Sequence, residues 1–177
     1  MLKSDEQVDN LFQTSTWEES LADFVSGSTG PVHFVGLGSP VRQDDGVGPA
    51  VIKTLIKEVG KKNSNLIFHT PEPNPERLIG DLASGTDRVV IFDAVQAMKP
   101  GGQIVSARVD DTKYGFFATH NVPLRLIPGL SQAKDRFLLV GIQPVLADVG
   151  EGLSKPVEES MRKIVELVRS ISGELNG

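Results

Sequence analysis

Apolar runs that suit buried strands alternate with segments of helical periodicity along most of this chain. The run from Val89 to Phe92 is wholly apolar, as expected for a parallel strand covered by helices on both faces. Strands are predicted at 32–37, 66–68, 88–92, 103–109 and 136–142. Helices are predicted at 46–59, from 75 onward and at 155–171. This order predicts an α/β fold: a twisted, mostly parallel five-stranded sheet with helices on both faces.

The first thirty residues are more polar than the rest. Two overlapping capping boxes, Ser15 with Glu18 and Thr16 with Glu19, predict the start of an amphipathic helix over 16–26. We therefore expect residues 1–30 to form an N-terminal amphipathic extension that packs on a single α/β domain of residues 31–177.

Composition excludes several classes of function. The net charge of −5 disfavours nucleic acid as a partner, since binding to phosphates needs a basic surface. The chain has no cysteine, so a disulfide, a thiolate metal site and a cysteine nucleophile are excluded. No signal peptide is apparent, and no apolar run approaches the roughly 20 residues that span a bilayer. We expect a cytoplasmic protein without a membrane partner.

Three polar side chains fall where the predicted strands end. Asp45 lies in the glycine-rich loop after the first strand, Asp93 follows the third, and His120 follows the fourth. Ligands of open α/β sheets bind outside the carboxyl ends of the strands. Two carboxylates and an imidazole that meet there are suitable ligands for a divalent metal such as nickel, zinc or iron.

Each of these residues also has a purely structural interpretation. Asp44 and Asp45 precede a predicted helix and can cap its free N–H groups. Asp93 can begin the turn that follows its strand, and His120 can be a structural histidine. The amides of Gln143 and Asn121 can either support the site or hydrogen-bond a loop.

Five motifs in a fixed order resemble the nickel–iron hydrogenase maturation endopeptidases, over about residues 32–168. They are Gly36-Leu37-Gly38-Ser39, Asp44-Asp45-Gly46-Val47-Gly48, the strand ending in Asp93-Ala94 with Pro100-Gly101 after it, Thr119 to Leu124 (Thr-His-Asn-Val-Pro-Leu), and Gly141-Ile142-Gln143-Pro144. The last motif is similar to the branch that serves formate-linked hydrogenases. Ser39 stands where an asparagine is common in the family.

The resemblance implies an endopeptidase that trims the C-terminal extension of a hydrogenase large-subunit precursor after nickel has been loaded. It implies that Asp45, Asp93 and His120 are the catalytic and metal-recognising residues. The nickel is then carried by the substrate, and no tightly bound cofactor of the protease itself is expected. The partner is the large-subunit precursor, with neither nucleic acid nor membrane.

The sequence also bears on three other functions. A dinucleotide site fails because Val41 stands where the third glycine of G-x-G-x-x-G is required. A peptidyl-tRNA hydrolase begins with a similar segment, but here His120 and Asn121 lie far downstream of it. A metal-sensing chaperone that docks on the large subunit without cutting it uses the same trio, so the sequence leaves that alternative open.

Overall fold

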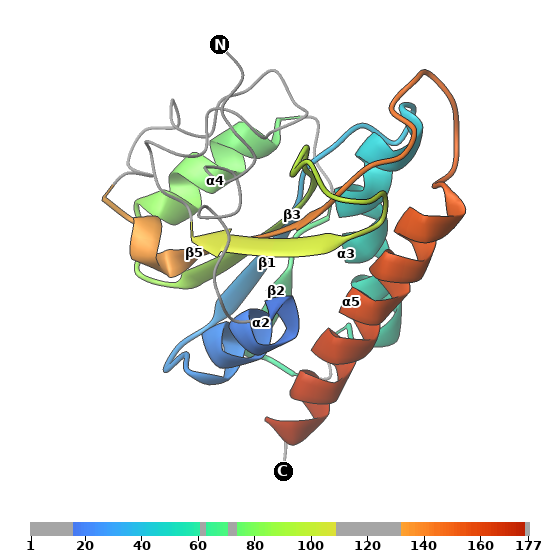
Figure 1. Cartoon of the computed structure of the whole chain (residues 1–177). Helices are drawn as coiled ribbons and strands as arrows, with labels where there is room; N and C mark the ends of the chain where they lie inside the picture. The colour runs from blue at the N-terminus through green and yellow to red at the C-terminus, as the bar shows by residue number, and fades with distance from the viewer. Residues whose placement is uncertain (1–15, 61–62, 71–73, 109–131, 176–177) are drawn as a thin grey trace.

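The computed structural model describes residues 16–60, 63–70, 74–108 and 132–175 (Figure 1). One five-stranded sheet has the order β2-β1-β3-β5-β4. The strands are β1 (Val32–Gly36), β2 (Leu66–Phe68), β3 (Arg88–Ala94), β4 (Ile104–Arg108) and β5 (Phe137–Ile142). All neighbouring pairs are parallel except β4 with β5. The predicted fold class is confirmed.

Helices cover both faces of this sheet (Figure 1). They are α2 (Trp17–Ser26), α3 (Val47–Glu58), α4 (Pro75–Ala83) and α5 (Lys155–Glu174). Two short 3-10 turns, η1 (Gln43–Gly46) and η4 (Lys134–Arg136), precede α3 and β5. The last helix continues to Glu174, three residues beyond the predicted end, and Val165, Val168 and Ile171 form part of its buried stripe.

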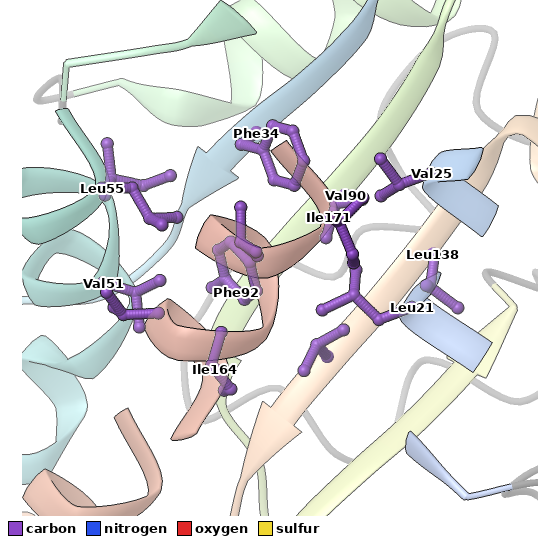
Figure 2. Packing of buried hydrophobic residues seen from close by; sticks show 14 of the residues in the cluster. Leu21, Val25, Phe34, Val51, Leu55, Val90, Phe92, Leu138, Ile164 and Ile171 are labelled. Atoms are coloured by element: carbon purple, nitrogen blue, oxygen red, sulfur yellow. The ribbon is translucent and has the colours of Figure 1, made fainter. Parts of the chain in front are cut away.

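Alternation along the strands divides the apolar side chains between two cores. On β3, Val90 and Phe92 face the side covered by α2, α3 and α5, whereas Val89 and Ile91 face the side covered by α4. Figure 2 shows the first core, where Phe34 and Phe92 lie among side chains from these helices. Each strand is therefore covered on both faces, which explains the continuous apolar runs in the sequence.

The N-terminal helix α2 belongs to the larger of these cores. Thr16 Oγ1 accepts from the N–H of Glu19 (3.2 Å) and Glu19 Oε2 accepts from the N–H of Thr16 (3.1 Å), which confirms the second predicted capping box. Leu21 and Phe24 are buried there, and α2 contacts α5 and β4. The division of the chain at residue 30 stays a prediction, and residues 1–15 lie outside the described ranges.

Glycine allows the loop after β1 to lie directly on the ends of β1 and β3. The N–H of Leu37 donates to the carbonyl oxygen of Phe92 (2.8 Å). A Cβ at Gly48 would lie 2.1 Å from the carbonyl oxygen of Leu37 and 2.4 Å from that of Phe92. Gly38 has φ +130°, and a Cβ there would lie 1.8 Å from the carbonyl oxygen of Asp45. The residues of this loop are thus held against the carboxyl end of β3.

We expect Gly48→Ala to lower the free energy of unfolding by about 1–3 kcal/mol or more, because the added methyl group meets backbone oxygens that cannot move away cheaply. Urea unfolding measures the change. Gly173→Ala in α5 is the matched control: nothing lies within 4 Å of its added Cβ, so about 0.5–1 kcal/mol of stabilisation is expected from helix propensity. Equal stability of Gly48→Ala and the unsubstituted chain would contradict the close contact.

Candidate active site

The sheet order creates a topological switch point between β1 and β3. From β1 the chain passes to β2 on one side and then returns to β3 on the other. Such a switch point leaves an opening outside the carboxyl ends of the two strands, where ligands of α/β proteins bind. The turn η1 contacts β3 at this edge. Asp45 and Asp93 both lie here, one on each of the two elements.

Asp45 is held in η1 by backbone hydrogen bonds and is only 5% exposed. Its Oδ2 accepts from the N–H of Ser39 (3.0 Å), and its own N–H donates to the carbonyl oxygen of Arg42 (3.2 Å). The bond from residue 39 comes from the backbone and does not need an asparagine side chain. The serine at this position therefore leaves the hold on Asp45 intact.

Asp93 is 1% exposed and belongs to β3 itself. The strand continues to Ala94 because Asp93 pairs with Gly141 of β5 and Ala94 pairs with Ile142. The interpretation of Asp93 as the first residue of a turn is therefore wrong. Aspartate is seldom buried so completely unless its charge is paired or serves a site, so its place at the switch point makes it a candidate functional residue.

His120 lies outside the described residues, as do Thr119 and Asn121. Its convergence with the two acids stays a prediction. Within the described ranges, no group of three or more His, Asp or Glu residues could hold a metal ion. The site there consists of the two carboxylates alone.

The other two histidines of the chain are engaged with each other elsewhere. His33 Nδ1 lies 2.8 Å from His69 Nε2, and His33 Nε2 lies 3.2 Å from a carboxylate oxygen of Asp87. This cluster includes the second residue of β1 and the residue before β3, so it lies toward the start of these strands, whereas the two buried acids lie at their ends.

Asp44 has a role that the sequence did not reveal. Its side chain is completely buried. Its Oδ2 accepts from the N–H of Val145 and of Leu146 (both 2.8 Å). The N–H of Ser154 donates to Oδ1 (2.6 Å) and the hydroxyl of Ser154 donates to Oδ2 (2.8 Å). Asp44 thus anchors the loop after β5 to the loop after β1.

Helix capping is therefore wrong for Asp44, whose carboxylate oxygens accept from Val145, Leu146 and Ser154 instead. The N-cap residues of η1 and α3 are Arg42 and Gly46, and neither makes a side-chain cap hydrogen bond. The carboxylates of Asp44 and Asp45 instead bind backbone N–H groups of two loops, one distant and one near. The distant partners lie about a hundred residues along the chain, so no local pattern could have indicated them.

A family model described as HycI, hydrogenase maturation protease, matches residues 50–171 of this chain. The chain belongs to the hydrogenase maturation protease family. The matched range includes Asp93 and His120 and begins five residues after Asp45. Membership of this family of endopeptidases disfavours the peptidyl-tRNA hydrolase interpretation.

Individual relatives agree with this family. The chain is 25% identical to a putative hydrogenase maturation protease of Methanocaldococcus jannaschii over 150 residues, 80% of this chain and 88% of the relative. It superposes with a TM-score of 0.71 on the NiFe hydrogenase maturation protease HycI of Thermococcus kodakarensis, at 27% identity, covering 87% of this chain and 99% of that one. The HybD maturation protease of the same organism shares the fold, with a TM-score of 0.59 at 22% identity over 80% of this chain and 99% of that one.

Gln143, in the Gly-Ile-Gln-Pro motif, supports the loop after β3. Its Oε1 accepts from the N–H of Ala97 (2.8 Å), and its Nε2 donates to Gln96 Oε1 (2.9 Å). The loop hydrogen-bonding alternative is confirmed for this residue.

In the parts of this maturation protease that the structure describes, no helix is both long and apolar enough to cross a membrane.

We expect Asp44→Asn to lower the free energy of unfolding by about 1–3 kcal/mol, because an amide NH₂ cannot accept the hydrogen bonds that one carboxylate oxygen now receives. Urea unfolding measures the change, and the slope of the unfolding free energy against urea concentration should equal that of the unsubstituted chain. Asp148→Asn, an exposed acid of the same loop, is the control and should change stability by less than about 0.5 kcal/mol. If both variants unfold alike, Asp44 is not the anchor.

Proposed function

We propose that this chain is an endopeptidase that removes the C-terminal extension of a nickel–iron hydrogenase large-subunit precursor once nickel has been inserted. The observation that supports it most is the pair of buried carboxylates, Asp45 and Asp93, at the switch point of a sheet in a chain of this family. A positive ion presented by the substrate is a suitable partner for two such groups.

The donor set fits a metal ion that belongs to the substrate. Asp45 and Asp93 offer carboxylate oxygens, and His120 offers an imidazole nitrogen, which suits nickel. The bonds among His33, His69 and Asp87 leave His120 as the histidine available for this edge of the sheet. Three protein groups leave positions for ligands that the large subunit retains. No tightly bound cofactor of the protease is needed.

Recognition of the ion places the scissile peptide bond. The N–H of Ser39 holds the carboxylate of Asp45, and Asp93 is fixed in a paired strand. Both carboxylates are therefore rigid points against which the substrate is oriented. Holding reactants in one geometry accounts for a large part of enzymatic acceleration. Nickel in the substrate also polarises a neighbouring carbonyl group. Since the chain has no cysteine, hydrolysis proceeds here without a thiolate nucleophile.

Two finer points stay predictions of the sequence. The Gly141 to Pro144 motif favours a partner from the formate-linked branch of hydrogenases. The other is a cytoplasmic location.

Nickel dependence is the first test of this function. We expect the purified protein to shorten nickel-loaded precursor and to leave metal-free precursor uncut, because the ion carries the recognition. The mass of the precursor before and after incubation measures cleavage. Cleavage of both forms at similar rates would refute recognition of the metal. Binding of the nickel-loaded precursor without any loss of mass would favour the non-cleaving chaperone.

Replacement of the trio is the second test. Asp45→Asn, Asp93→Asn and His120→Ala should each slow processing by on the order of 10²-fold or more, because misplacing the substrate is sufficient for such a loss. Asp45→Asn keeps an oxygen that can accept from Ser39, so its fold should persist.

Asp81→Asn, at an exposed acid on α4, serves as the matched control and should process the precursor at the unsubstituted rate. Thermal unfolding of all four variants should stay near that of the unsubstituted chain. Full activity in any variant of the trio excludes that residue from the site, and loss of folding would instead support its structural interpretation.

A further inference from the structure

Exposed apolar side chains are concentrated in the loops that follow β1, β3 and β5. In the described part of the chain, seven large apolar residues are exposed, and five of them lie in the loops after β1, β3 and β5. These five, here called the apolar rim, are Val41, Met98, Val145, Leu146 and Val149. Single exposed apolar residues are ordinary, but a gathering of them at one site marks a surface that binds another molecule.

Hydrogen bonds join two of these loops into one surface. The N–H of Gly150 donates to the carbonyl oxygen of Val41 (3.0 Å), and the N–H of Gln43 donates to that of Gly150 (2.9 Å). Val41 and Val149 therefore lie on neighbouring loop segments. These two residues are 59% and 87% exposed, respectively. In Figure 1 the orange segment after β5 runs beside the cyan turn that precedes α3.

The rim is rigid as well as exposed. Asp44 fixes the backbone of Val145 and Leu146. The side chain of Val145 also lies against Gly101, where an added Cβ would come within 2.3 Å of its Cγ2. Gln143 holds the loop that leads to Met98 through the N–H of Ala97. A surface that is already ordered loses little conformational entropy when a partner binds.

The rim is linked to the candidate active site through η1, because Asp44, which binds the backbone of Val145 and Leu146, directly precedes Asp45 there. Resting on the proposed function, we propose that the apolar rim docks the large-subunit precursor through an apolar surface beside its C-terminal extension. Contacts there add affinity for the substrate protein without touching the peptide bond that is cut.

The charge around the rim favours a protein over a membrane as the occupant. Asp148 and Glu151 lie in the same loop as Val149 and are exposed, and the chain carries a net charge of −5. Anionic lipid surfaces attract basic segments and repel acidic ones. An apolar patch with charged residues at its margin is typical of protein interfaces.

The test replaces two exposed members of the rim. The double variant Val41→Ser/Val149→Ser should raise the KM for nickel-loaded precursor by about tenfold and leave kcat unchanged, since truncation of apolar contacts at an interface weakens binding. Ile56→Ser and Leu175→Ser are matched controls, because both side chains are exposed and lie outside these loops, on α3 and after α5. Urea unfolding checks that every variant is folded.

A binding measurement separates this proposal from the proposed function. Precursor immobilised with and without nickel should bind the double variant more weakly than the controls by a similar factor. If the precursor binds through the rim but never loses mass, the protease function fails and the docking surface stands. If cleavage occurs with the same KM and affinity in the double variant and the controls, or if neither precursor form binds, the docking proposal is overturned.

Sedimentation with phosphatidylcholine–phosphatidylglycerol vesicles tests the alternative occupant. The unsubstituted chain should stay in the supernatant. Vesicle binding that is lost in the double variant, with unchanged precursor kinetics, would assign the rim to a membrane and refute docking of the precursor.

Discussion

The backbone contact among Leu37, Gly48 and Phe92 fixes the position of the rest of the site. Only a residue without a side chain permits the first turn of α3 to come so close to two carbonyl oxygens. That approach sets where η1 lies relative to β3, and hence where Asp45 lies relative to Asp93. The separation between Asp45 and Asp93 therefore depends on this close backbone packing and on the hydrogen bond from the N–H of Leu37 to the carbonyl oxygen of Phe92.

Most of the fold was predictable because each strand and helix has a local pattern. The run from Val89 to Phe92 is apolar throughout because β3 is central and covered on both sides. Thr16 and Glu19 mark the start of α2 because the capping bonds span three residues. The extension of β3 through Asp93 was missed, since it arises from pairing with β5, which lies far along the chain.

The candidate site was predictable in part for the same reason. Asp45 and Asp93 could be identified because the ends of parallel strands meet at one edge. The separate role of Asp44 could not, because its hydrogen-bond partners are backbone N–H groups at residues 145, 146 and 154. Two neighbouring acids of one motif thus have different partners: Asp44 anchors the loop after β5, and Asp45 accepts from the N–H of Ser39. Their order along the sequence does not reveal which is which.

Asp44 binds main-chain groups at positions 145 and 146, and it makes no demand on the side chains there. Substitutions at these positions can therefore change the outward shape and polarity of the loop while its backbone stays in place. A scaffold built in this way can diverge in which partner it accepts without losing its internal architecture.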